Sequence, residues 1–181
     1  MKPLAVLSLF ALALLPASPS LPASSLHGAT VDRGAFNGGW SRCDDDTGVA
    51  VCELIYVEQR GTRVCGVSEE SSSNYQYRDR FVATATGDRA KLEKVCGEGG
   101  SADTSKCPGD SDVSGEAIGW TKSEASLALC NGRLVSNNTG EVGCGIARER
   151  AGLNRSSDAG FIDNFSVEDK QWLASCIAGQ E

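Results

Sequence analysis

Histidine is nearly absent from this chain of 181 residues, which contains a single one, His27. Without a histidine in the body of the chain, no Ser-His-Asp or Cys-His catalytic machinery can be assembled. There is no C-x-x-C pair either, although zinc sites use closely spaced cysteine and histidine ligands. Nucleophile motifs such as G-x-S-x-G and phosphate-binding glycine loops are missing as well. We therefore expect no catalytic residue, no metal site and no cofactor, and we do not expect an enzyme.

Basic residues are also scarce relative to acidic ones. The chain has 17 Lys and Arg against 24 Asp and Glu, which gives a formal net charge of −7. Nucleic acids and anionic membranes are recognised mainly through Lys and Arg, so neither is an expected partner. After residue 23 no apolar stretch approaches the roughly 20 residues that cross a bilayer, so no membrane span is expected.

The first 23 residues predict a secretory signal peptide. A single charged side chain, Lys2, precedes an almost wholly apolar run from Leu4 to Leu15, and small residues and prolines follow up to Ala23. The run is too short for a transmembrane anchor. We expect a secreted or periplasmic protein, and the fold is predicted from the chain after residue 23.

All the cysteines lie in the predicted mature chain, and their number is even. The eight are Cys43, Cys52, Cys65, Cys96, Cys107, Cys130, Cys144 and Cys176. In an oxidising compartment an even number predicts four disulfides. Eight cysteines allow 105 pairings, so the connectivity stays open, although short loops favour Cys96–Cys107 and Cys130–Cys144.

Short stretches with alternating polar and apolar side chains dominate the first half of the mature chain. Four are expected to be strands: 49–59, 62–67, 80–86 and 89–96. Gly61 and Gly87 are expected in the turns of two hairpins, and residues 69–76 are expected to form a polar loop.

A further hairpin is predicted around Asn131-Gly132, because this dipeptide tolerates the two positive φ angles of a type I′ turn. The stretches 97–118 and 147–160 are expected to be loops. Near the C-terminus, Ser166 begins an S-x-x-D cap, and apolar residues recur at helical spacing, which predicts a short helix near 167–177.

These elements predict an all-β fold: a small antiparallel β-barrel of about eight strands, pinned by disulfides, with a short C-terminal helix. The barrel domain is expected over 38–181. Residues 24–37 have no apolar periodicity and are expected to form a flexible N-terminal arm.

One acidic motif resembles the start of a calcium-binding loop. It is Asp110-x-Asp112-x-Ser114-Gly115, but the position that should hold a bidentate glutamate holds Thr121. A solvated loop is the interpretation we prefer.

The first strands carry a pattern that resembles small calycin-like barrels, the group that includes lipocalins and avidin-like proteins. The pattern is Gly38-x-Trp40, followed by Ile55-x-Val57-x-Gln59-x-Gly61-x-x-Val64-x-Gly66. The resemblance implies that a tryptophan plugs one end of the barrel. The residues expected in the interior are Trp40, Ile55, Val57, Gln59 and Val64.

A narrower likeness is to the bacterial eight-stranded barrel inhibitors of secreted zinc proteases. Cleavage after Ala23 would expose Ser24-Ser25-Leu26, which is similar to the mature start of that family. In those proteins the arm enters the protease cleft. The resemblance therefore implies that Ser24, Ser25 and Leu26 contact a partner.

We expect an exported, non-catalytic binding protein, in the first instance an inhibitor of a secreted hydrolase or protease. A barrel that holds a small apolar ligand is the alternative, and it needs an interior left open. A hydrolase that uses a pair of carboxylates is the lesser alternative, since 24 acidic residues offer many pairs and none stands out.

Overall fold

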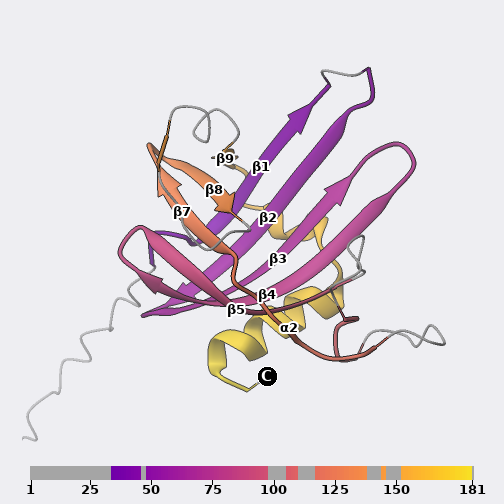
Figure 1. Ribbon diagram of the computed structural model, residues 1–181. Coiled ribbons are helices and arrows are strands. Elements are labelled where there is room, and N and C mark those ends of the chain that lie inside the picture. Colours follow the sequence, from indigo (N-terminus) through magenta and orange to yellow (C-terminus); the bar gives the residue numbers. More distant parts are fainter. Residues whose placement is uncertain are drawn as a thin grey trace, which may run out of the picture. The chain divides into compact units, whose positions relative to one another are not determined.

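The computed structural model describes residues 34–45, 48–97, 105–109, 117–137, 144–145 and 152–180 (Figure 1). The strands and helices in these residues are β1 (Gly38–Asp44), β2 (Val51–Arg60), β3 (Arg63–Ser71), β4 (Gln76–Thr86), β5 (Arg89–Gly97), β6 (Thr121–Lys122), β7 (Ser126–Cys130), β8 (Arg133–Asn137), β9 (Leu153–Arg155), the 3-10 helix η1 (Phe161–Asn164) and the α-helix α2 (Val167–Ala178). No helix among them is long and apolar enough to cross a membrane.

Eight of these strands form a closed antiparallel barrel. Each strand from β1 to β5 pairs with the next, β5 pairs with β7, and the series continues through β8 to β9. The pairing of β9 with β1 closes the ring, and β6 is an additional strand on β5. The expected all-β barrel with four disulfides and one C-terminal helix is therefore confirmed.

The predicted turns lie where the strands reverse. Asn131 and Gly132 have φ angles of 50° and 80°, and they join β7 to β8 as the dipeptide predicted. Gly61 and Gly87 also have positive φ, in the β2–β3 and β4–β5 connections. These turns need little help from the rest of the fold, which is why the local sequence is sufficient to predict them.

Two predicted loops are partly strand. The polar stretch 69–76 contains the end of β3 and the start of β4, so the turn between them covers only Ser72–Tyr75. Strand pairing satisfies the backbone groups here whatever the side chains are. The closing strand β9 lies within the predicted loop 147–160. It has three residues, and its position is fixed by its neighbours rather than by its own composition.

The barrel interior is filled by one apolar cluster to which all eight barrel strands contribute. Its members are Phe36, Trp40, Ile55, Val57, Val64, Phe81, Ala83, Ala85, Ala90, Leu127, Leu134 and Leu153. The largest of them, Trp40 and Phe36, are 1% and 0% exposed. The packing of side chains from all eight strands in one cluster holds the strands in one register.

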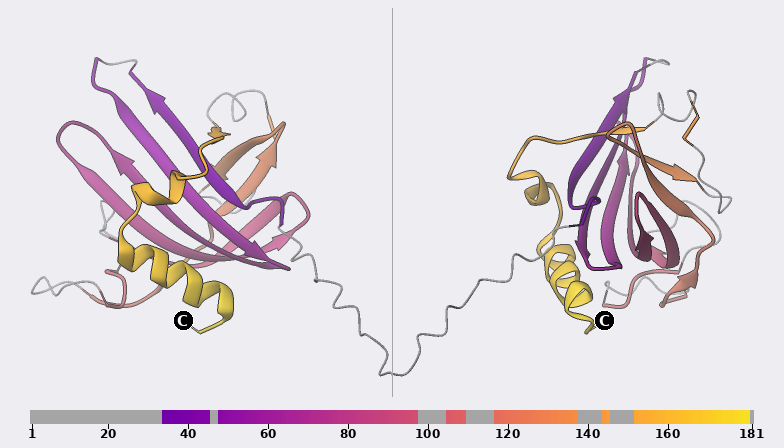
Figure 2. Two further views of the ribbon diagram at one scale, coloured as in Figure 1. Left: turned by 180° about the vertical axis from the view of Figure 1, so that it is seen from behind. Right: turned by 90° about the vertical axis from the view of Figure 1, so that its left-hand side faces the viewer.

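A second apolar layer lies outside the barrel wall, under η1 and α2. Figure 2 shows the two helices on one outer side of the barrel. Phe161, Leu173 and Cys176 pack there against Val67 and Val82, which point outward from β3 and β4. Helix α2 begins at the predicted cap, where the Ser166 hydroxyl accepts a hydrogen bond from the Asp169 backbone N–H.

All eight cysteines are paired in the structure. The disulfides are Cys43–Cys52, Cys65–Cys176, Cys96–Cys107 and Cys130–Cys144. The two pairs that short loops favoured, Cys96–Cys107 and Cys130–Cys144, are both present. The long-range pair Cys65–Cys176 joins β3 to α2 across 111 positions of sequence, so no spacing rule could have found it.

The start of the barrel domain differs from the predicted boundary at residue 38. Residues 34–37 make a turn that packs onto the barrel, and Phe36 within it is fully buried. They are therefore part of the domain and not of a flexible arm, because burial of one aromatic side chain anchors the whole turn. The predicted signal peptide and residues 24–33 lie outside the described residues.

Candidate functional site

One end of the barrel, which we call the plugged end, is closed by residues 34–37 together with Trp40. The Trp40 indole N–H donates a hydrogen bond of 3.0 Å to the Phe36 carbonyl. The side-chain amide of Gln59 accepts from the Phe36 backbone N–H at 3.2 Å and donates to the Gly61 carbonyl at 2.8 Å. Polar groups at this end thus find partners within the protein, which makes the closure specific.

The Asn37 side chain links the turn of residues 34–37 to β2 by hydrogen bonds to the β2 backbone. Its side-chain oxygen accepts from the Gln59 backbone N–H at 2.7 Å, and its side-chain nitrogen donates to the carbonyls of Gln59 and Gly34. One side chain therefore replaces the backbone partner that β2 would otherwise lack at its end.

Arg155 covers the plug from the closing strand. Its guanidinium lies 4.2 Å from the centre of the Trp40 ring and donates hydrogen bonds of 2.5 Å and 2.6 Å to the carbonyls of Asn37 and Ala35. The arginine therefore ties β9, β1 and the turn together through a cation–π contact and two charge-assisted hydrogen bonds.

The two glycines before Trp40 are required by this packing. Gly38 has a φ of 118°, which side-chain-bearing residues rarely adopt. A Cβ on Gly39 would lie 2.3 Å from the Phe161 ring of η1. The Gly38-Gly39-Trp40 sequence thus places Trp40 inside the barrel while an aromatic ring contacts the backbone from outside.

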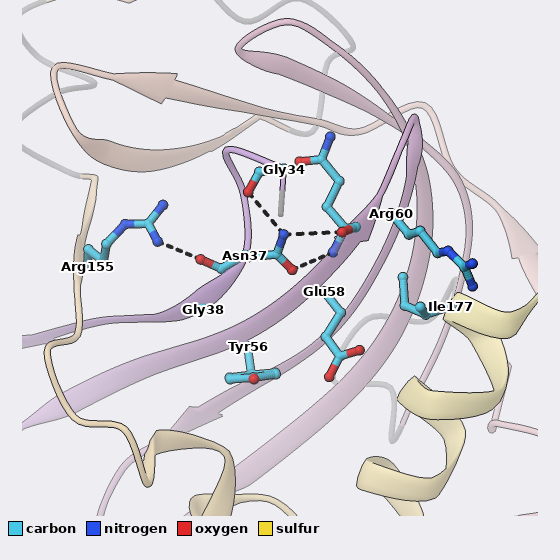
Figure 3. Close-up of a pocket in the computed structure, with 9 residues that line it drawn as sticks. Gly34, Asn37, Gly38, Tyr56, Glu58, Arg60, Arg155 and Ile177 are labelled. Atoms are coloured by element: carbon cyan, nitrogen blue, oxygen red, sulfur yellow. Dashed lines mark hydrogen bonds between the residues drawn. The ribbon is translucent and has the colours of Figure 1, made fainter. Parts of the chain in front are cut away.

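A groove with a volume of about 520 Å³ lies beside the plug, between the start of β1, the end of β2 and the end of α2 (Figure 3). Its lining residues are Gly34, Asn37, Gly38, Tyr56, Glu58, Gln59, Arg60, Arg155 and Ile177. Tyr56, Glu58 and Arg60 alternate along the outer face of β2 and supply aromatic, acidic and basic groups. Gly34, the first described residue, is one of the lining residues of this groove.

The structure brings the predicted interior residues together at the plugged end. Trp40, Ile55, Val57 and Val64 are at most 4% exposed and belong to one cluster. Gln59 is half-buried and caps that cluster. The predicted contact residues Ser24, Ser25 and Leu26 lie outside the described residues.

The opposite end, which we call the distal end, carries charged groups on the inner face. Strand register places Arg42, Glu53, Glu70 and Tyr77 in one row across β1 to β4. This row lies two residues beyond Trp40 and Ile55, so its side chains share their inward face. The interior therefore changes from apolar at the plugged end to charged at the distal end.

Glu53 is the most perturbed carboxyl of this row. Burial raises the pKa of the Glu53 carboxyl, the nearby Arg42 guanidinium lowers it, and the negative charges of Glu70 and Asp44 raise it further. Arg42 is 3.0 Å from Asp44 and 3.9 Å from Glu53, measured between charged atoms. Two carboxylates thus share one arginine, and burial, the largest of these effects, leaves the pKa of the Glu53 carboxyl raised.

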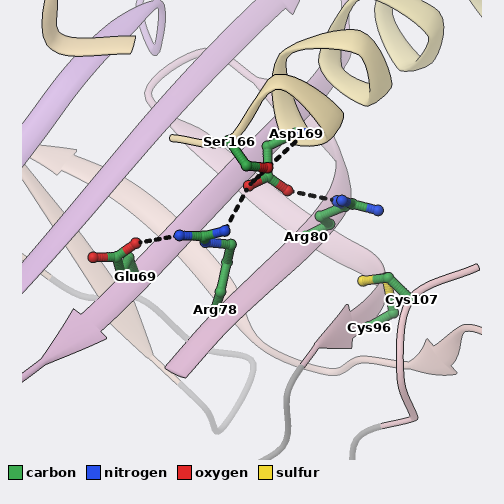
Figure 4. Close-up of polar contacts among 7 residues, drawn as sticks. All are labelled: Glu69, Arg78, Arg80, Cys96, Cys107, Ser166 and Asp169. Atoms are coloured by element: carbon green, nitrogen blue, oxygen red, sulfur yellow. Dashed lines mark hydrogen bonds and ion pairs between the residues drawn. A yellow bond between two sulfur atoms is a disulfide. The ribbon is translucent and has the colours of Figure 1, made fainter. Parts of the chain in front are cut away.

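An ionic cluster joins α2 to the outer wall (Figure 4). Asp169 is fully buried, and its carboxylate lies 2.8 Å from Arg80 and 3.4 Å from Arg78. Arg78 also reaches Glu69 at 2.9 Å, and the Ser166 hydroxyl donates to Asp169 at 2.8 Å. Both buried carboxylates are thus paired with arginine, and Asp169 is the one that joins the helix to the barrel wall.

Sequence reasoning missed two of these residues and the arginine partners of a third. Arg155 stands in a polar stretch with no local signal, and Phe36 was assigned to the arm. Asp169 was found as part of a helix cap, but nothing in the sequence pointed to its two arginine partners. In the described residues no group of three or more His, Cys, Asp or Glu side chains is placed to hold a metal ion. Residues 110–116, with the calcium-like motif, lie outside them.

Comparison with protein-family models, curated proteins and solved structures finds no match to this chain.

Proposed function

We propose that this chain is an exported, non-catalytic binding protein that inhibits a secreted hydrolase through the plugged end of its barrel and residues 24–33. The observation that carries the proposal is the filled interior. Every barrel strand contributes to the buried cluster around Trp40, so the barrel acts as a rigid scaffold and binding is left to its exterior. The predicted signal peptide and the four disulfides support export.

The calycin-like type of barrel belongs to the same proposal. The closed ring of eight antiparallel strands is compatible with it, and the burial of Trp40 at one end of the barrel supports it. The narrower likeness to barrel inhibitors of zinc proteases is supported by the place where the chain enters the domain. Gly34, the first described residue, lines the groove beside the plug, and we propose that a partner contacts this groove as well as residues 24–33.

Two alternatives receive less support. A small apolar ligand would need open apolar space, whereas the plugged half is packed with large side chains and the distal row is charged. A hydrolase would need a pair of unpaired, converging carboxylates. The buried Glu69 and Asp169 are held by Arg78 and Arg80. In the distal row, Glu53 lies 3.9 Å from Arg42, and Glu70 accepts a hydrogen bond from Tyr75.

The proposal is tested by inhibition assays on secreted zinc proteases with two forms of the mature protein. One form starts at Ser24, and the other lacks Ser24–Val31 and keeps the whole plug. We expect the melting temperature to change by less than about 3 °C, which in a domain of this size corresponds to roughly 1 kcal/mol. Inhibition should weaken at least a hundredfold, because the arm adds contacts to the partner and little to the core.

A control with the same eight residues in scrambled order separates sequence from length. It should inhibit as poorly as the truncated form. Unchanged inhibition by the truncated form would remove the arm from the mechanism, and failure of the complete mature protein to inhibit any secreted zinc protease would overturn the proposal.

A further inference from the structure

The distal ends of β1 to β4 make a second surface of unusual composition. The row Arg42, Glu53, Glu70 and Tyr77 faces inward there, and Asp44 follows Arg42 on the same face. Three carboxylates thus accompany one arginine. We call these five residues the distal face; it lies at the other end of the barrel from Gly34.

Aromatic and apolar side chains are exposed beside these charges. Tyr75 and Tyr77 stack with their ring centres 4.9 Å apart, and the Tyr75 hydroxyl donates to Glu70 at 2.9 Å. Tyr77 is 39% exposed, and Val49, in the β1–β2 connection, is 44% exposed. Exposed large apolar groups next to an excess of acidic side chains are more typical of a contact surface than of a solvated barrel rim.

The disulfide Cys43–Cys52 crosslinks the strands of this surface and does not belong to the buried core. Cys43 and Cys52 are partners across β1 and β2, on the face opposite to the distal face, and Cys43 is exposed. Cys65–Cys176, in contrast, joins fully buried residues of the outer layer. The end of the β1–β2 hairpin has no buried apolar residue to hold it. The disulfide keeps this end in one conformation, which reduces the conformational entropy lost when a partner binds.

We propose that the distal face binds a basic, extended segment of a protein partner. Carboxylates accept charge-assisted hydrogen bonds from lysine and arginine, and the two tyrosine rings offer their faces to the same cations. Charge complementarity favours this occupant, because the distal face has three carboxyl groups and one arginine. The surface is separate from the plugged end, so it does not depend on the partner that residues 24–33 contact.

The test uses acetylated hexalysine as the probe and the ¹⁵N-labelled mature protein with all disulfides intact. Titration at 0.15 M salt is expected to shift amide resonances of residues 42–53 and 68–79. The double variant Glu53→Gln/Glu70→Gln should weaken hexalysine binding at least tenfold, and Tyr77→Ser should weaken it several-fold. Hexaglutamate should shift none of these resonances.

A matched control removes two acidic charges elsewhere. Asp88 and Glu124 are exposed, Asp88 lies in the β4–β5 turn at the end of β4 remote from Tyr77, and Asp88→Asn/Glu124→Gln changes the net charge equally. It should leave the dissociation constant within twofold. Equal weakening by both double variants, or shifts centred outside 42–53 and 68–79, would mean non-specific attraction and would overturn the proposal.

Two further variants separate this surface from the proposed function. Cys43→Ala/Cys52→Ala should fold and bind hexalysine several-fold more weakly, and unchanged binding would contradict the role of the disulfide. The form that lacks Ser24–Val31 should bind hexalysine as the complete protein does. Loss of hexalysine binding in that form would contradict a separate surface, whatever its effect on protease inhibition.

Discussion

Individual side chains attach helix α2 to the barrel wall, and Asp169 is the clearest example. Its carboxylate is buried against the barrel wall and lies within ion-pair distance of both Arg80 and Arg78. Removing one member of a buried ion pair leaves the others without a counter-charge in a place that water does not reach. Exposed ion pairs have no such consequence.

Replacement of Asp169 by Asn should therefore destabilise the protein by about 3 kcal/mol, or about 6–12 °C in melting temperature. The matched control is Asp163→Asn, which removes an exposed carboxylate 2.7 Å from Lys170. That control should cost less than about 1 kcal/mol. Urea unfolding at pH 7 measures both, and equal effects would show that the Asp169 cluster is no anchor.

The raised pKa of Glu53 predicts that the stability of the protein depends on pH. Burial raises the pKa of this carboxyl in the folded state, so the folded protein holds the proton more tightly than the unfolded chain does. The stability contributed by the neutral form is complete below the ordinary glutamate pKa of about 4.3, and it is lost as the pH rises through the higher folded value.

Glu53→Gln should consequently be more stable than the natural protein at pH 7. The difference should shrink as the pH falls and vanish below the ordinary glutamate pKa. Thermal melts of both forms between pH 3 and pH 8 provide the measurement. A variant that is less stable at pH 7 would show that the contact of Glu53 with Arg42 outweighs its burial.

At the scale of elements, α2 is held at both ends by different chemistry. The ionic cluster and the Ser166 cap fix its start, and Cys65–Cys176 fixes its end, where Gly179 adopts a left-handed conformation with a φ of 75°. The Arg63 side chain also donates to the Cys176 carbonyl at 2.7 Å. The helix therefore covers the outer apolar layer even though it is the last element of the described chain.

The disulfides should differ in their effect on stability according to the loops they close. In the chain-entropy model, loss of Cys65–Cys176, separated by 111 positions, costs about 5 kcal/mol, and loss of Cys43–Cys52, separated by 9, costs about 2.5 kcal/mol. Paired alanine variants measured by urea unfolding test the order. A larger loss for Cys43→Ala/Cys52→Ala would contradict the view that this disulfide serves a surface.

Elements with strong local signals could be predicted from the sequence. The Asn131-Gly132 hairpin and the helix that starts after Ser166 depend on turn and cap chemistry within a few residues. Strand β9 could not be predicted from the sequence, because its three residues are extended only through their pairing with β1 and β8. The residues of the plug were predicted only in part. Trp40 belongs to the Gly38-x-Trp40 motif, whereas Arg155 reaches the plug only because β9 pairs with β1, 115 positions away in the sequence.

At the scale of the whole molecule, the barrel has two unlike ends. The plugged end joins apolar packing to a closed hydrogen-bond network, and the distal end exposes tyrosines and carboxylates. Closure of the ring through β9 leaves none of its eight strands as a full-length free edge, which protects against strand-to-strand aggregation. A filled barrel with two different ends suits a scaffold that binds by its exterior.

The central claim is that this barrel is a filled scaffold, and titration with a long-chain fatty acid tests it most directly. Calorimetry and tryptophan fluorescence of the mature protein should show no saturable binding, because Trp40, Phe36 and their neighbours already occupy the apolar interior. Stoichiometric binding that quenches tryptophan fluorescence and is abolished by Trp40→Phe would contradict the claim, since it would place a small apolar ligand inside the barrel.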